Sequence, residues 1–297
     1  MTPTSRRVRG MGIELRVLEW PSGREEESRG DVVLLHGFMD AAWSWDLVAP
    51  ALVHEGFRVI APDLRGFGES DRVPAGGYYY FPDYIFDLAE LVDALGLAKL
   101  ALVGHSMGGN VATMYAGLYP DRIVKLALLE GLGPPSFGHE LIIERELAWI
   151  EGVRRIHAKP EKALTYDEVV RRLSSNHPGV PDDVLRRRAE QLTRPLGDGT
   201  YGWAFDPLHR TRSPVAFSVD RWRAHARRVT APVLCVGGGT TGFHPEDEQE
   251  RVASFANVRT AEISDAGHMM HWTRPAEVAR LLVEHLGLER PDGHGVL

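Results

Sequence analysis

The stretch LALVGHSMGGNVATMYAGL, residues 100–118, determines the fold expected for this chain. Leu100–Val103 is an apolar run typical of a buried strand, and Met107–Leu118 is typical of a helix. Ser106 stands between them in Gly-His-Ser-Met-Gly, where the flanking glycines let backbone segments approach closely in a sharp turn. Such a turn holds the serine in a strained conformation with its hydroxyl exposed. We therefore predict that Ser106 is a nucleophile.

An alternation of strands and helices extends from this stretch. Further apolar runs that predict strands are Asp31–Leu35, Phe57–Ala61 and Ile123–Leu129. The stretches that predict helices between the strands are Ala42–Glu55 and Phe81–Leu95. Ile13–Trp20 alternates in polarity and ends at a Pro-Ser-Gly turn, which predicts an antiparallel edge strand. The expected fold is α/β, with a mostly parallel sheet flanked by helices.

The alternation of expected strands and helices stops after residue 132. Residues 133–229 contain three expected helices and no expected strand: Glu140–Ile156, Tyr166–Leu173 and Pro181–Leu192. Alternation then resumes with strand Val233–Val236, helix Glu246–Phe255, strand Val258–Ile263 and helix Pro275–Leu286. We therefore expect residues 1–132 and 230–297 to form a core and 133–229 a helical cap. The cap should cover the carboxyl ends of the strands, where such sheets bind ligands.

A histidine late in the chain is expected to serve as the base. A serine hydroxyl is a poor nucleophile near neutral pH, so a base must remove its proton during attack. His268 follows the expected strand Val258–Ile263 in a loop, in keeping with the order serine, acid, histidine. His271 is the alternative, but it lies closer to the last helix. We favour His268 because of its loop position.

The acid that would orient this histidine has two candidates. The loop after Val233–Val236 begins Gly-Gly-Gly-Thr-Thr-Gly-Phe and carries no carboxylate before Glu246 and Asp247. Glu130, in contrast, ends the strand Ile123–Leu129 directly. A carboxylate at the end of a buried strand requires a hydrogen-bonding partner, which an imidazolium would supply. We predict Glu130 as the acid and keep Asp247 as the alternative.

Two backbone amides are expected to stabilise an oxyanion. The turn at Ser106 supplies the N–H of Met107, and the loop after Asp31–Leu35 is expected to supply the N–H of Phe38. Because both roles belong to the backbone, substitution of either side chain should not remove them.

The composition limits the remaining classes. The 297 residues carry a formal net charge of −7, which argues against a nucleic-acid-binding protein. Neither a secretory signal nor an apolar run long enough to span a membrane is recognised, so we expect a cytoplasmic protein. The single cysteine, Cys235, lies in an apolar run and is expected to be buried. Nothing in the sequence indicates an oligomeric state.

Several motifs together resemble the α/β-hydrolase superfamily and, within it, the serine hydrolase-like family. They cover most of the chain, from about Gly12 to Leu286, and comprise His36–Asp40, Asp63–Ser70, Gly104–Gly109, Glu130–Pro134, Trp203–Pro207 and Gly267-His268. The resemblance implies an esterase-type hydrolase that needs no cofactor. In that family the acid after the pre-cap strand is usually aspartate, so Glu130 is a longer replacement. Haloalkane dehalogenases and epoxide hydrolases are disfavoured, because their nucleophile is aspartate and position 106 is serine.

The expected reaction is hydrolysis of small to medium carboxylic esters through an acyl-enzyme on Ser106, with His268, Glu130 and no metal ion. The same groups suit lactone, amide or carbon–carbon bond hydrolysis or a cofactor-free haloperoxidase, and a ligand-binding receptor without turnover is the non-enzymatic alternative. Four aromatic residues are possible walls of the substrate pocket, namely Trp43, Phe137, Trp149 and Trp272.

Overall fold

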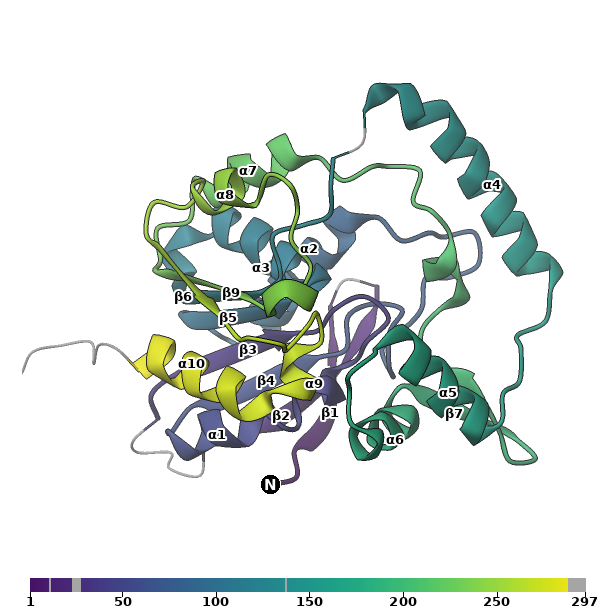
Figure 1. The fold of residues 1–297 in the computed structure, drawn as a ribbon, viewed down its shortest axis with the longest axis horizontal. Coiled ribbons are helices and arrows are strands. Elements are labelled where there is room, and N and C mark those ends of the chain that lie inside the picture. The colour runs from purple at the N-terminus through teal and green to yellow at the C-terminus, as the bar shows by residue number, and fades with distance from the viewer. Residues whose placement is uncertain (11, 23–27, 137, 288–297) are drawn as a thin grey trace, which may run out of the picture.

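A mostly parallel sheet lies at the centre of the protein (Figure 1). The computed structural model describes residues 1–10, 12–22, 28–136 and 138–287. The strands occur in the order β1-β2-β4-β3-β5-β6-β9-β10, and only β1, β2 and β4 meet in antiparallel pairs. Their bounds are Thr4–Arg9 (β1), Glu14–Trp20 (β2), Asp31–Leu35 (β3), Arg58–Pro62 (β4), Leu100–His105 (β5), Ile123–Leu129 (β6), Val233–Gly237 (β9) and Val258–Glu262 (β10). The expected fold class is confirmed.

Helices cover both faces of this sheet (Figure 1). One face carries α1 (Ala49–His54) and α10 (Pro275–Gly287), and the other carries α2 (Phe81–Ala94) and α3 (Met107–Leu118). The short helices α8 (Glu248–Val252) and α9 (Met270–Thr273) complete the core. Strands β3 and β5 read as continuous apolar runs because helices bury both of their faces.

Two local features of the core differ from expectation. The predicted helix Ala42–Glu55 is divided into a 3₁₀ turn at Ala42–Trp45 and α1, and Pro50 lies in the first turn of α1. Proline lacks an N–H and is tolerated at the start of a helix but not in its interior. Strand β1 was not predicted, because only Val8 of its six residues is buried and the pattern has no apolar alternation.

Between β6 and β9 the described residues form four α-helices and a hairpin. The helices are α4 (Ile142–Ala158), α5 (Tyr166–Asn176), α6 (Asp182–Gln191) and α7 (Val219–Ala226), and the hairpin joins β7 (Thr193–Gly197) to β8 (Thr200–Trp203). The expectation of a segment without strands is wrong. The turn residues Asp198 and Gly199 both have positive φ, 48° and 71°, as the Asp-Gly turn of a tight hairpin requires.

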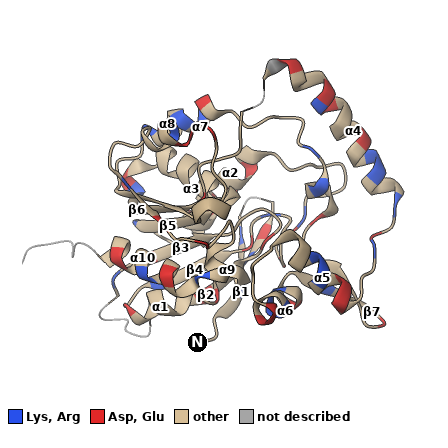
Figure 2. Ribbon diagram, in the orientation of Figure 1, with Lys and Arg blue, Asp and Glu red and all other residues tan. Residues whose placement is uncertain are grey.

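The helices of this segment differ in their surroundings. Figure 1 shows α4 projecting from the body of the molecule, and Figure 2 shows charges of both signs along α4, α5 and α6. Helix α7, in contrast, packs against α3, where a side chain at Gly117 would meet the backbone of His225. The segment contacts the core through α7 near its C-terminal end and through α6 in its middle, where α6 meets the 3₁₀ turn Ala42–Trp45.

Arg188 attaches α6 to the core. Its fully buried guanidinium lies 2.9 Å from an Asp46 carboxylate oxygen and 5.2 Å from the centre of the Trp272 ring. Removing one partner of a buried ion pair leaves the other charge without compensation. We expect Arg188→Ala to lower the free energy of unfolding in urea by about 3 kcal/mol. The control is Arg186→Ala, which removes an exposed ion pair and should cost less than about 1 kcal/mol; equal losses would contradict the prediction.

Buried His285 should make stability depend on pH. Its Nε2 donates to the carbonyl of Leu126 at 3.0 Å, and burial lowers its pKa to about 4. Below the pKa of an unfolded histidine, about 6.5, the unfolded chain binds the proton more readily, so folding loses stability as the pH falls toward 4. We expect His285→Gln, which keeps a donor but does not titrate, to weaken the pH dependence of urea unfolding. An unchanged dependence would count against this assignment.

Candidate active site

Ser106 occupies the turn between β5 and α3. Its backbone has φ 50° and ψ −115°, a conformation that few L residues adopt. A Cβ at Gly104 would lie 2.4 Å from the carbonyl oxygen of Gly108, and one at Gly108 would lie 2.4 Å from that of Leu35. Both positions therefore require glycine, and the predicted strand, sharp turn and helix are present.

Glu130 lies immediately after β6 with φ 46° and is almost fully buried. Its Oε2 is 2.6 Å from Nδ1 of His268 and also accepts the N–H of Phe243 at 2.8 Å. Its Oε1 accepts the N–H of Gly238 at 2.8 Å. The loop after β9 thus gives backbone amides to a carboxylate that comes from the end of another strand.

The glycines of that loop make room for the long Glu130 side chain. A Cβ at Gly242 would lie 2.0 Å from Oε1 of Glu130, and one at Gly238 would lie 2.7 Å from the same atom. The glycine-rich loop after β9, which carries no carboxylate of its own, therefore accommodates the carboxylate of Glu130 from the end of β6.

His268 lies in the loop after β10, and 38% of its side chain is exposed. Because the Glu130 carboxylate accepts a hydrogen bond from Nδ1–H, the neutral imidazole keeps Nε2 as its basic nitrogen. Ser106, Glu130 and His268 line the same cavity. This arrangement leaves a partly exposed imidazole in the cavity that Ser106 lines.

The two alternative residues lie elsewhere. His271 is fully buried, with Nε2 at 3.1 Å from Oγ of Ser44 and 3.5 Å from Oδ2 of Asp40. Asp247 pairs with Arg251 at 2.7 Å and with Arg223 at 3.1 Å, and its hydrogen bond from Arg251 lowers its pKa. The structure brings Glu130, and not Asp247, to His268.

The backbone of the loop after β3 passes beside Ser106. A Cβ at Gly37 would lie 3.4 Å from Cβ of Ser106, so this loop and the turn that holds Ser106 are in contact. The next residue, Phe38, lines the cavity together with Met107 at the start of α3. The two predicted amide donors therefore come from segments that flank Ser106.

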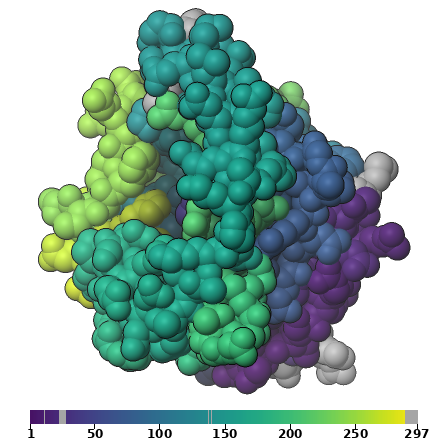
Figure 3. All heavy atoms as spheres, turned by 90° about the vertical axis from the view of Figure 1, so that its right-hand side faces the viewer, coloured from purple at the N-terminus to yellow at the C-terminus, as the bar shows by residue number. Residues whose placement is uncertain are grey.

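The cavity has a volume of about 850 Å³ and a largely aromatic wall. Figure 3 shows a hollow beside α4, between this teal helix and the yellow-green C-terminal segments. Most of the aromatic wall comes from the start of α2 and the residues just before it. These side chains are Tyr78, Tyr79, Tyr80, Phe81 and Tyr84. The run of four consecutive aromatics at 78–81 was the available signal in the sequence, and it was missed.

The predicted aromatic walls do not line this cavity within the described part of the chain. Trp272 is buried against Ser44, Trp149 packs edge to face against Tyr78 with ring centres 5.5 Å apart, and Trp43 lies near Arg16. Phe137 lies outside the described residues. Trp272 therefore belongs to the interior, whereas Trp43 and Trp149 are only partly buried.

Among the described residues, the side chains with the types and spacing of metal ligands are Asp40, His105 and His271, whose ligand atoms lie within 4.8 Å of one another. Each already has a protein partner. Both oxygens of Asp40 accept hydrogen bonds, from the N–H of Ala41 and the hydroxyl of Ser44. Asp40, Ser44 and His271 form an internal hydrogen-bond network, and His105 bonds through Nε2 to the carbonyl of His268, so all three side chains already contact protein groups.

Comparison with known proteins shows the family. A family model for the alpha/beta hydrolase fold matches residues 31–275. The chain belongs to the alpha/beta hydrolase fold family. A serine hydrolase-like protein from Danio rerio is 26% identical over 271 residues, which cover 88% of this chain and 82% of that protein. The resemblance stated from the motifs is therefore confirmed.

Other members of the alpha/beta hydrolase family are also similar to this chain. Epoxide hydrolase A from Mycobacterium tuberculosis is 38% identical over 323 residues, covering 97% of this chain and 98% of that enzyme. The thioesterase domain from the curacin biosynthetic pathway has a TM-score of 0.83 at 22% identity and covers 96% and 99% of the two chains. The 38% identical relative supports a hydrolase, and the likeness to the thioesterase domain shows the fold. No helix in the described part of the chain is long and apolar enough to cross a membrane.

Proposed function

We propose that this protein hydrolyses small to medium carboxylic esters through an acyl-enzyme on Ser106. The observation that carries the proposal is the 2.6 Å contact between Glu130 and Nδ1 of His268 in the cavity that Ser106 lines. A carboxylate placed there holds the imidazole in the tautomer that a general base needs and stabilises the imidazolium that forms.

The reaction follows from the positions of these groups. Ser106 Oγ attacks the ester carbonyl carbon as its proton moves to Nε2 of His268, and the amides of Phe38 and Met107 stabilise the oxyanion. His268 then gives this proton to the departing alkoxide, which leaves an acyl group on Ser106. Water attacks the acyl carbon with His268 again as base, and the acid leaves as Ser106 regains its proton. No step requires a metal ion or cofactor.

The cavity favours an apolar acyl or alcohol group. Its aromatic wall is joined by Met114, Leu208 and Phe217, so a bound hydrocarbon or aryl group would be removed from water. The volume of about 850 Å³ is that of a site for a medium-sized ligand.

Epoxide hydrolysis is the second candidate, because Epoxide hydrolase A is among the relatives. Attack of Ser106 on an epoxide carbon would form an alkyl ether on the enzyme. An ether has no carbonyl for water to attack, whereas an acyl ester does. Serine at position 106 therefore favours acyl transfer over epoxide opening.

A substrate screen tests the proposal. The purified protein should hydrolyse apolar p-nitrophenyl esters, and a matched set of thioesters, lactones, amides and epoxides should establish the preferred bond. Mass spectrometry of a rapidly quenched reaction should find the acyl group on the peptide that contains Ser106. Ligand binding without turnover of any member would overturn the enzymatic proposal and favour the receptor.

A further inference from the structure

His105 connects the nucleophile turn to the loop of the proposed base. It lies between Gly104 and Ser106, and only 1% of its surface is exposed. Its Nε2 is 2.8 Å from the backbone carbonyl oxygen of His268, a residue 163 positions later. Because a carbonyl only accepts, Nε2 of His105 carries the proton.

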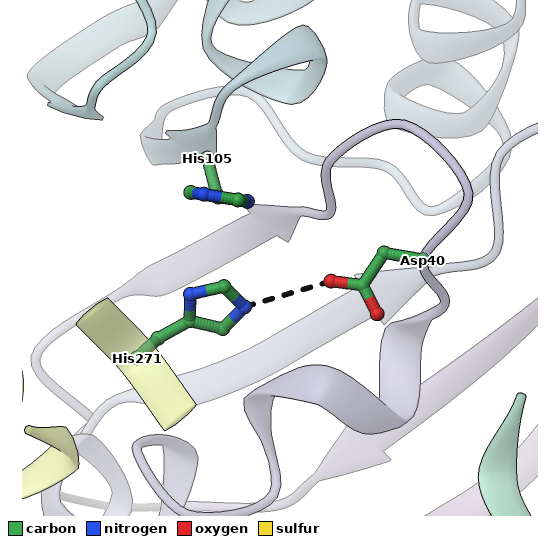
Figure 4. Close-up of side chains that lie close together, drawn as sticks. All are labelled: Asp40, His105 and His271. Atoms are coloured by element: carbon green, nitrogen blue, oxygen red, sulfur yellow. Dashed lines mark ion pairs between the residues drawn. The ribbon is translucent and has the colours of Figure 1, made fainter. Parts of the chain in front are cut away.

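Buried side chains pack around the ring of His105. The ring centre lies 4.4 Å from that of His271, whose Nε2 faces Asp40 and Ser44 (Figure 4). Figure 4 shows the three side chains converging from the end of β5, the loop after β3 and α9. Burial, together with the neighbouring His271 and His268, lowers the pKa of His105 well below its ordinary value. A neutral ring in one tautomer can therefore act as a fixed donor.

The loop that carries His268 needs such a support. Asp265 and Gly267 both have positive φ, 55° and 67°, so the loop approaches His268 through two unusual backbone conformations. The N–H of Gly267 bonds to the carbonyl of Gly238 at 2.8 Å, and the His268 side chain bonds to Glu130. The bond from His105 is the direct link between this loop and the residue next to Ser106.

We propose that His105 is a positioning residue, whose Nε2–H holds the backbone of His268 and thereby sets the distance between the base and Ser106. The proposal rests on the proposed role of His268 as base. A displacement of about 1 Å between reacting groups can lower a rate by about 100-fold. Loss of the bond should therefore reduce the chemical step while leaving substrate binding unchanged.

The test compares three replacements of His105. His105→Gln places an amide N–H near the position of Nε2, His105→Asn is polar but one methylene too short, and His105→Leu has no donor. For a p-nitrophenyl ester, we expect kcat of the Asn and Leu variants to fall by roughly 100-fold with KM unchanged, and the Gln variant to keep most of kcat. Phosphonylation of Ser106 by a fluorophosphonate should slow in the same order.

His285 provides a matched control. It is also a buried histidine whose Nε2 donates to a backbone carbonyl, that of Leu126, but it lies on α10 and does not line the cavity. His285→Leu should lower the melting temperature with kcat unchanged. If the Leu variant of His105 does not fold, the comparison of Gln with Asn carries the test.

The outcomes separate the two proposals. If wild-type protein is neither labelled at Ser106 nor active on any ester, the proposed function fails, and the role of His105 fails with it. If wild-type protein is labelled and active but the Asn and Leu variants keep wild-type kcat, only the role of His105 is overturned. A loss of kcat in all three variants, Gln included, would also overturn it, because retention of the donor would then be irrelevant.

Discussion

Replacement of Ser106 by alanine is expected to lower kcat for a p-nitrophenyl ester by at least about 10⁴-fold. The hydroxyl is the proposed attacking group, and the strained backbone that carries it is otherwise unchanged, since the turn depends on Gly104 and Gly108. The measurements are steady-state hydrolysis and labelling by a fluorophosphonate, which should be lost together.

The control for this substitution is the melting temperature, which should be close to that of the wild-type protein. Alanine is one atom smaller than serine, and Ser106 is only partly buried. Retained turnover in a folded Ser106→Ala protein would show that Ser106 is not the nucleophile. Labelling at another residue would then identify the nucleophile.

Replacement of Glu130 by glutamine is expected to lower kcat by roughly 10⁴-fold, as loss of the acid does in serine proteases. The amide keeps the length of the side chain, but it carries no charge to stabilise protonated His268 across the present 2.6 Å contact. KM should change much less than kcat, because the carboxylate oxygens already bond to the protein and not to a ligand.

Asp247→Asn is the matched comparison for Glu130→Gln. It also converts a carboxylate into an amide, but Asp247 pairs with Arg251 and Arg223. Arg251 also donates to the carbonyls of Leu132 and Gly133. We therefore expect a lower melting temperature and nearly unchanged kcat. The reverse ranking of the two variants would move the acid to the loop after β9.

Local sequence was sufficient for the features that depend on neighbouring residues. The apolar runs of β3 and β5 predicted buried parallel strands, and α3 begins and ends where its pattern indicated, at Met107 and Leu118. Ser106 was recognised for the same reason, because the turn that holds it is built from adjacent glycines whose steric requirement is visible in the sequence.

Features that depend on residues far apart in the chain could not be predicted from local sequence alone. Strand β1 has little apolar pattern and forms by pairing with β2, and the aromatic wall at residues 78–81 has no periodicity that separates a pocket from a core. The hairpin of β7 and β8 differs, because the sequence Asp198-Gly199 is typical of a tight hairpin turn and was overlooked.

The sequence by itself determined the α/β fold, the turn at Ser106 and a short set of candidate partners for it. Only the tertiary structure decided among those partners, by bringing Glu130 within 2.6 Å of a histidine 138 residues away. The tertiary structure also explains why the loop after β9 is rich in glycine, because Gly238 and Gly242 leave the space that the Glu130 carboxylate fills. Spacing along the chain cannot contain this information, since the carboxyl ends of parallel strands meet at one edge of the sheet whatever the length of chain between them.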